Sequence, residues 1–441
     1  MHPVTHRPRW LVAFALVAAL TLLASACTGD DGAAEDSGEA AVEDDQERAA
    51  SDAGYDGEVR ALGAEDPGIP EEFPEMVPTT SWPVAEPDHL VAVEYLGPGQ
   101  GAAHLVDLDE GQLGYVSVGL TDVYMLSGGG EDAPTIVAAG EQFRPRGARG
   151  QAVAVTTFWD GNGEVSGEVI LPRVQYRRQF NPSEAMSSDG RYVYLIDTIL
   201  NGIVAVDVIE QEMAGELAIP GCSVRNIAAV GPDTFYLPCW SSGEVIEVTV
   251  SGDGLEIADR VQAFEEGTQM LDYTFFAAES RTILLFTRFS EAITLDLAGG
   301  LPEEVADPVD VMVKGETIVD YDSRLSPDGT RALVAYAEGE DYTEYVETYR
   351  VYDTGTWELA GEFAAPEDGI EDLLYSRDGS ELYVLQNEVT VTDEEGDEDE
   401  VSRILTLDPE SGEVLADVEL ELTSGDDFDA IYLTTVVEDE E

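Results

Sequence analysis

A short motif recurs along this chain, and its spacing limits the folds that the chain can adopt. The motif is an acidic turn that runs into an apolar strand, as in Ser187-Ser-Asp189-Gly190-Arg-Tyr-Val-Tyr194. Its acids stand at positions 189, 233, 279, 328 and 378, so the spacings are 44, 46, 49 and 50 residues. Asp-Gly suits the tight turn between antiparallel strands, where a positive φ is needed. Spacing of this kind indicates one supersecondary unit copied along the chain.

A second motif alternates with the first: a strand ending in Asp, an acidic turn, then Gly-Glu and another strand. Its copies run from Val206-Asp207 to Gly215-Glu216, from Tyr352-Asp353 to Gly361-Glu362, and from Leu407-Asp408 to Gly412-Glu413. From about residue 88 the chain is a series of short strand-like runs, and no long segment has a helical period. Four short strands per unit are typical of a β-propeller blade. We therefore predict an all-β propeller over residues 86–441 with seven four-stranded blades, although counting alone leaves six or eight open.

The N-terminus has the pattern of an export signal. A start with His6, Arg7 and Arg9 precedes the apolar run Trp10–Leu23, which is too short for a stable membrane span. The following Leu23-Ala24-Ser25-Ala26-Cys27 resembles a bacterial lipobox, in which the cysteine is diacylated. We predict a lipoprotein signal peptide over residues 1–26 and lipidation of Cys27, which would anchor the protein outside the cytoplasmic membrane. Ordinary signal cleavage beside an incidental cysteine is the alternative.

The composition is very acidic, with 92 acidic and 21 basic residues and a net charge of −71. Residues 27–85 are rich in Asp, Glu, Ala and Gly, so we predict a lipidated, disordered acidic linker there. The charge argues against a nucleic-acid partner, which needs a basic face. For the propeller we interpret it as a solvated surface suited to high salt, where ions screen self-repulsion. A docking face for a basic partner is the alternative.

Three cysteines are present. With Cys27 lipidated, Cys222 and Cys239 remain, and they flank one predicted turn. A disulfide between them is expected in an oxidising extracytoplasmic space. Two buried free thiols are the alternative.

The sequence shows no catalytic, cofactor-binding or metal-binding residues of its own. The mature chain has two histidines, His89 and His104, and neither stands near a nucleophile motif, so we expect surface or edge residues. The acidic run 393–400 lacks the ligand spacing of an EF-hand and is expected at a hairpin tip. The clearest basic cluster is Arg144, Arg146 and Arg149, which could pair with the protein's own acids or bind an anionic partner.

Two stretches resemble the heavy (β) subunits of the quinoprotein amine dehydrogenases, which act on methylamine and aralkylamines. One is Phe143-Arg144-Pro-Arg146-Gly-Ala-Arg149-Gly150 with the strand and the Glu168-Val-Ile-Leu-Pro172 close that follow; the other is Pro220-Gly221-Cys222 with Phe235-Tyr-Leu-Pro-Cys239. The resemblance covers most of residues 88–430. It implies a seven-bladed periplasmic propeller, a disulfide between the two cysteines, and a small cysteine-rich partner subunit that holds a tryptophan-derived quinone and deaminates primary amines oxidatively.

Three functional hypotheses follow. The first is a membrane-anchored, non-catalytic subunit of an amine dehydrogenase, with its quinone in the partner subunit. The second is a lipoprotein propeller that binds another envelope protein or a ligand and has no enzymatic activity. The third is a lactonase or other hydrolase with a metal in the central channel, which would need inward-facing acidic or amide side chains.

Overall fold

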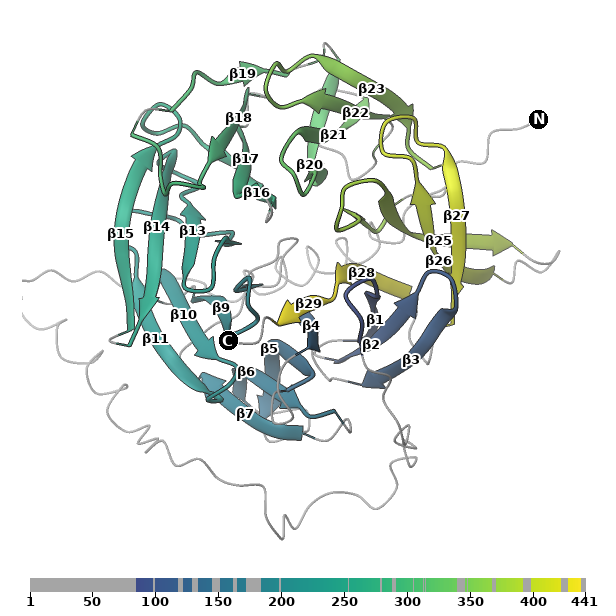
Figure 1. Ribbon diagram of the computed structural model, residues 1–441, viewed down its shortest axis with the longest axis horizontal. Helices are drawn as coiled ribbons and strands as arrows, with labels where there is room; N and C mark the ends of the chain where they lie inside the picture. Colours follow the sequence, from purple (N-terminus) through teal and green to yellow (C-terminus); the bar gives the residue numbers. More distant parts are fainter. Residues whose placement is uncertain are drawn as a thin grey trace, which may run out of the picture. The chain divides into compact units, whose positions relative to one another are not determined.

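The computed structural model is an all-β, seven-bladed propeller (Figure 1). It describes residues 85–441 except 98–99, 118–121, 129–133, 145–150, 162–164, 172–183, 198–199, 253, 278–279, 288–290, 304, 312, 314, 339–345, 347, 367–369, 392–397, 422–426 and 438–441. Residues 1–84, which contain Cys27, the signal and nearly all of the linker, lie outside this part, so those assignments stay predictions. None of the described segments forms a helix that could cross a bilayer.

The first three blades contain both ends of the propeller. From the axis outward, blade 1 is β28 (Asp427–Leu433), β1 (Leu90–Gly97), β2 (Gln100–Asp107) and β3 (Gly111–Ser117); blade 2 is β29 (Thr435–Val437), β4 (Asp122–Gly128), β5 (Ile136–Arg144), β6 (Gln151–Trp159) and β7 (Val165–Leu171); blade 3 is β8 (Glu184–Met186), β9 (Tyr192–Asp197), β10 (Gly202–Asp207) and β11 (Glu212–Ala218).

The other four blades each have four strands in chain order. Blade 4 is β12 (Ala228–Ala229), β13 (Thr234–Pro238), β14 (Glu244–Ser251) and β15 (Gly254–Gln262); blade 5 is β16 (Met270–Ala277), β17 (Thr282–Thr287), β18 (Glu291–Asp296) and β19 (Val309–Asp310); blade 6 is β20 (Glu316–Leu325), β21 (Arg331–Glu338), β22 (Thr348–Asp353) and β23 (Leu359–Ala364); blade 7 is β24 (Asp372–Tyr375), β25 (Leu382–Val391), β26 (Glu398–Leu407) and β27 (Val414–Leu420).

The core lies between the blades. Seven apolar clusters fill the seven junctions, because the inner strands bury side chains on both faces. At the junction of blades 3 and 4, for example, the rings of Tyr194 and Phe235 lie 4.2 Å apart between centroids. At the junction of blades 7 and 1, Leu385 packs with Leu90 and Phe428. Each blade therefore depends on both of its neighbours.

The first repeat motif forms the turn between the first and second strands of a blade. In blade 3 the Ser187 hydroxyl donates to Asp189 at 2.6 Å, and Asp189 accepts the Arg191 amide at 3.0 Å. The same bonds recur at Ser326 with Asp328 and at Ser376 with Asp378. The glycines that follow these acids have φ of 75°, 72° and 73°, which explains Asp-Gly in the repeat.

The second repeat motif forms the turn between the third and fourth strands. Asp207, Asp353 and Asp408 each accept two backbone amides there. The fourth residue after each acid has positive φ: 53° at Gln211, 57° at Trp357 and 68° at Gly412. The motif thus supplies both the cap and the left-handed residue of one turn type.

The second motif aligned Gly215, Gly361 and Gly412 as one position, but the structure places them at two different positions of the blade. Gly215 and Gly361 lie within fourth strands, where the neighbouring blade approaches so closely that a Cβ on Gly361 would stand 2.3 Å from the Glu410 carbonyl oxygen. Gly412 lies instead in the turn before β27. By strand register, Ala416 takes the place of Gly361 in blade 7. The sequence alignment of this motif in blade 7 was therefore wrong by four residues.

We predict that Gly361→Ala destabilises the protein by about 1 to 3 kcal/mol, because the added methyl group must displace backbone of the next blade. Urea unfolding measures the change. The control is Gly252→Ala, where a Cβ would meet nothing within 4 Å. Equal stability of the two variants would contradict the close approach of the blades.

We also predict that Asp378 stabilises the fold only above acidic pH. The Ser380 amide, followed by the Ser380 and Ser376 hydroxyls, holds the pKa of Asp378 below its ordinary value. A carboxyl whose pKa falls on folding contributes stability above its unfolded pKa, about 4, and loses it as the pH falls through the folded pKa. The difference in stability between wild type and Asp378→Asn should therefore be largest near about pH 6 and should disappear below about pH 3. Urea unfolding against pH tests this, with exposed Asp109→Asn as the control.

Candidate functional site

The propeller has two faces that differ in their loops. Because strands alternate in direction, the turns between first and second strands and between third and fourth strands share one face. We call this the Asp-turn face, after Asp189, Asp328, Asp353, Asp378 and Asp408. Loops between second and third strands and between blades share the opposite face, which carries Cys222 and Cys239; we call it the disulfide face.

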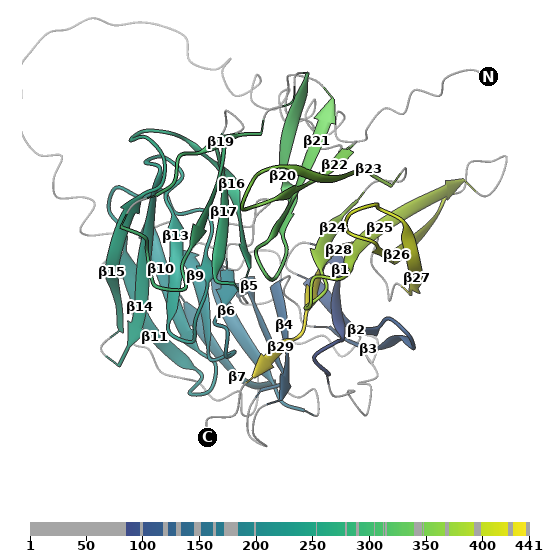
Figure 2. The same cartoon turned by 45° about the horizontal axis from the view of Figure 1, so that its top comes forward.

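Blade 7 extends a hairpin beyond the ring on the disulfide face. Strands β25 and β26 pair along ten residues each, from Leu382 with Leu407 to Val391 with Glu398. Their neighbours stop earlier, since β24 reaches only to Leu385 and β27 only to Ser402. The rest of this hairpin is a two-stranded ribbon that runs past the other strands (Figures 1 and 2). Its connecting segment, 392–397, contains much of the acidic run and lies outside the described residues.

Blade 2 extends a second hairpin on the same face. Strands β5 and β6 pair from Ile136 with Trp159 to Arg144 with Gln151, whereas β4 pairs only with residues 136–139 of β5. Arg144 is the last residue of β5, at the end of this ribbon. Arg146 and Arg149 follow in the connecting segment, outside the described residues. The first residue of the predicted basic cluster thus lies at the far end of a hairpin.

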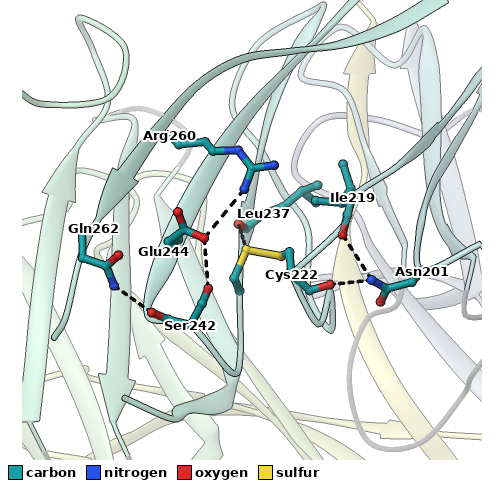
Figure 3. Close-up of a disulfide and its surroundings, with 9 residues drawn as sticks. Asn201, Ile219, Cys222, Leu237, Ser242, Glu244, Arg260 and Gln262 are labelled. Carbon is teal, nitrogen blue, oxygen red and sulfur yellow. Dashed lines mark hydrogen bonds and ion pairs between the residues drawn. A yellow bond between two sulfur atoms is a disulfide. The ribbon is translucent and has the colours of Figure 1, made fainter. Parts of the chain in front are cut away.

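The disulfide between Cys222 and Cys239 is confirmed, with 4.8 Å between the Cα atoms (Figure 3). It joins the loop that enters blade 4 to the turn between β13 and β14. The Asn201 side-chain amide donates to the carbonyls of Ile219 at 3.2 Å and Cys222 at 2.8 Å. Beside the bond, the Arg225 guanidinium lies 4.2 Å from the centroid of the Trp240 ring. These contacts fix loops of blades 3 and 4 on this face.

The Asp-turn face holds the closure of the ring. Strand β28, near the C-terminus, pairs with β1 from Leu433 with Leu90 to Asp427 with Tyr95. The Arg377 guanidinium donates to the Pro87 and Thr434 carbonyls at 2.9 and 2.7 Å, and the Thr434 hydroxyl donates to the Glu86 carbonyl at 2.7 Å. Arg377 of blade 7 thereby binds both ends of the propeller. The linker therefore meets the propeller at Ala85, on this face.

Asp372 strengthens the closure near the axis. Its carboxylate accepts the Arg324 guanidinium at 2.6 Å and the Ile431 amide at 3.0 Å, and so connects blades 6, 7 and 1. Burial raises the pKa of Asp372 above its ordinary value, although Arg324 and the two amides that it accepts act in the opposite direction. The Asp372 carboxylate therefore serves to join three blades.

The expectation of surface or edge histidines is wrong. His104 is fully buried between blades 1 and 7, with Nε2 2.8 Å from the buried Glu94 carboxylate and its ring against Tyr115 and Phe428. A strand in blade 1 faces another blade on each side, so a polar pair there is enclosed. His89 is also buried; its Nδ1 accepts the Glu86 amide at 3.1 Å and its Nε2 lies 3.5 Å from Asp107.

One group of potential metal ligands occurs among the described residues: Glu86, Asp88 and His89. Both ring nitrogens of His89 already have protein partners, and the two acids are exposed. The group belongs to the ring closure on the Asp-turn face, away from the two ribbons.

Comparisons with known proteins show the fold alone. No family model and no curated protein matches the chain. Among solved structures, a periplasmic gluconolactonase from Pseudomonas aeruginosa is similar with a TM-score of 0.51 and 15% identity, over 79% of this chain and 99% of that chain. A putative 6-phosphogluconolactonase from Bacteroides fragilis has a TM-score of 0.50 and 10% identity, over 78% of this chain and 97% of that chain.

These findings correct the resemblance to amine dehydrogenase heavy subunits. The similar propellers are a gluconolactonase and a putative 6-phosphogluconolactonase, and no family model supports the amine dehydrogenase assignment. The two stretches that suggested it have structural explanations here: one belongs to the extended hairpin of blade 2, and the other is the disulfide between adjacent loops. Propellers share such features because their blades meet the same packing requirements.

We predict that the disulfide contributes about 3 kcal/mol of stability, given a sequence separation of 17 residues. Cys222→Ala with Cys239→Ala should lower the free energy of urea unfolding by this amount. Because both cysteines are at most 1% exposed, reductant should reach the bond only after unfolding. Rapid reduction of the folded protein, or unchanged stability of the double variant, would contradict the prediction.

Proposed function

We propose that this chain is a lipid-anchored, extracytoplasmic binding propeller that docks a partner protein on its disulfide face and performs no chemistry of its own. The observation that carries the proposal is the pair of ribbons on that face. At its base the blade 7 ribbon still packs on the ring, where Asn387 donates to the Phe428 carbonyl of blade 1. Its outer part, from Glu388 with Val401 to Val391 with Glu398, extends beyond the strands that pair with neighbours in the blade, as does the outer part of the blade 2 ribbon. Two-stranded extensions are marginally stable alone, so a partner surface that covers them supplies a reason for their length.

The charges at the ends of the ribbons define the partner. In the sequence, Asp393-Glu-Glu-Gly-Asp-Glu follows β25 of blade 7, and Arg146 and Arg149 follow Arg144, the last residue of β5 in blade 2. Blade 1 alone separates them in the ring. A complementary partner would present a basic patch to blade 7 and an acidic patch to blade 2. Opposite charges at two separate points fix the orientation of a docked protein more than they add affinity.

The proposed anchor fits this arrangement. The linker meets the propeller at Ala85 on the Asp-turn face, so its point of attachment leaves the disulfide face open. Cys27 supplies the lipidation site on the sequence pattern alone. Both parts of the proposal are therefore separately testable.

Lactone hydrolysis has only the fold likeness in its favour. The two similar structures are at most 15% identical to this chain, so they indicate the fold and not the activity. If the purified full chain hydrolyses gluconolactone, the statement that it performs no chemistry of its own is wrong.

We predict that Cys27→Ser moves the protein from the membrane fraction to the soluble extracytoplasmic fraction of its native host. Diacylation supplies two acyl chains, which suffice for stable anchoring, whereas the variant has none. Cell fractionation with mass spectrometry of the mature N-terminus measures both location and acylation. An unmodified Cys27 in wild type would overturn the anchor.

We further predict that neutralising either ribbon end disrupts the complex. One variant carries Arg144→Gln, Arg146→Gln and Arg149→Gln; the other carries Asp393→Asn, Glu394→Gln and Glu395→Gln. The matched control neutralises three exposed acids on the Asp-turn face, Asp109→Asn, Glu110→Gln and Glu210→Gln. Crosslinking in native membranes followed by mass spectrometry should detect one partner with wild type and with the control, and much less with either ribbon variant. Raised salt should weaken the same crosslinks.

Two results would contradict docking on the disulfide face. Crosslinks that persist in both ribbon variants and vanish in the control would place the partner on the Asp-turn face. Wild-type protein that crosslinks to no partner in intact membranes would remove the basis for a binding module.

A further inference from the structure

The junction of blades 4 and 5 contains an acid where the other aligned blades have small or apolar residues. In each blade the position can be found by strand register, because it pairs with the second or third residue of the second strand. These residues are Ala205, Glu247, Thr294, Val351 and Thr406 in blades 3 to 7. Glu247 of β14 thus departs from the repeat, and strand packing does not require it.

Glu247 lines an open groove of about 420 Å³ between blades 4 and 5 on the Asp-turn face. The other polar lining side chains include Asp233, Tyr236 and Arg281, and the loop at Gly299 and Gly300 forms part of the wall. A volume of this size falls in the range of small-molecule sites. The groove is remote from the disulfide face, so this inference goes beyond the proposed docking function.

The Glu247 carboxylate is held in place. Its Oε2 accepts the Leu301 amide at 3.2 Å, and it is hydrogen-bonded by the Tyr236 hydroxyl. Burial, followed by the charge of Glu247, raises the pKa of Tyr236 well above its ordinary value, so the phenol keeps its proton. A carboxylate fixed by two donors is an ordered acceptor for a cationic ligand group.

Arg281 supplies the opposite charge. The backbone carbonyl of Arg281 accepts the Leu297 amide, as the carbonyl of Arg191 in blade 3 accepts the Val208 amide, so the two arginines occupy the same position. The Arg191 guanidinium pairs with Asp207 of its own blade at 3.2 Å. Among the described residues, Arg281 has no such carboxylate partner. Its φ of 52° is a left-handed conformation that costs an L-residue about 1 kcal/mol or more. An exposed, strained arginine that lines a cavity is a candidate ligand-binding residue.

The corresponding groove between blades 6 and 7 provides an internal comparison. It holds about 100 Å³ and has Val351 in the place of Glu247. Arg331 crosses it, with ion pairs to Asp353 at 2.8 Å and to Glu410 of the next blade at 3.7 Å. There the charges neutralise one another across the junction. At blades 4 and 5 the acid and the base remain on an open cavity.

We propose that the groove between blades 4 and 5 binds a small zwitterion of amino-acid type, with its carboxylate on Arg281 and its ammonium group on Glu247, near Asp233. A simple anion would meet two carboxylates in a protein of net charge −71, and a simple cation would meet Arg281. A ligand that carries both charges can pair its anionic group with Arg281 and its cationic group with the carboxylates. The Tyr236 hydroxyl, fixed on Glu247, keeps that carboxylate oriented.

Calorimetric titration of the full lipidated chain in detergent tests the proposal. The probes are free L-amino acids, each compared with its α-amide, which lacks the carboxylate, and its N-acetyl derivative, which lacks the ammonium group. At least one free amino acid should bind saturably, and each blocked derivative should bind about tenfold or more weakly, because each loses a charge-assisted contact.

Two conservative variants assign the contacts. Arg281→Gln should lower affinity for the free amino acid to that of the amide and leave the affinity for the amide unchanged. Glu247→Gln should do the same with respect to the N-acetyl derivative. Circular dichroism and the unfolding midpoint establish that both variants fold, and Arg191→Gln, the matched change in blade 3, should leave binding unaltered.

Three results would overturn the proposal: no amino acid binds the wild-type chain, binding is unaffected by both variants, or one variant acts without the other. The last result would describe a site for a single charge. None of these results bears on the docking of a partner protein at the disulfide face.

Discussion

Closure of the ring is the constraint on which the other features of this propeller depend. Every apolar cluster lies between two blades, so an open ring would expose one surface on blade 1 and another on blade 7. Pairing of β28 with β1 joins residues that are more than three hundred positions apart. The Arg377 contacts and the Arg324–Asp372–Ile431 chain lie at this seam and tie both ends of the propeller to blade 7. Only with that seam closed do the seven junctions, and any groove or loop on them, have fixed geometry.

Several of the described arginines serve as internal ties. Arg350 pairs with Glu316 and Glu362 across three strands of blade 6, and Arg331 joins blade 6 to blade 7. Because 92 acids face 21 bases, most carboxylates are left to solvent or to the turns. In so acidic a protein, an arginine such as Arg281, which neither joins strands nor caps a turn among the described residues, is a stronger candidate for ligand binding than it would be in a neutral protein.

The propeller and its blade number were predictable because their signals are local. Asp189, Asp328 and Asp378 build their own turns, so the repeat is visible in short windows of sequence. The pairing of β28 with β1 has no local signal, since neither strand identifies its partner. The burial of His104 depends partly on Phe428 of β28, which reaches blade 1 only through the same long-range pairing, and it was missed for the same reason. Gly412 was misaligned because a glycine for positive φ and a glycine for close approach look alike in sequence. Glu247 becomes visible only after strand register aligns the blades.

The position of β1 also determines how the propeller responds to tension. Strand β1 begins at Leu90, shortly after Ala85, and lies between β28 and β2, antiparallel to both. A pull on the chain before residue 85, directed along the strand, loads all of these backbone hydrogen bonds together in shear instead of opening them one at a time. Arg377, which grips the Pro87 carbonyl, adds a side-chain tie at the point where the load enters. The seam that completes the ring thus also resists tension applied through the linker.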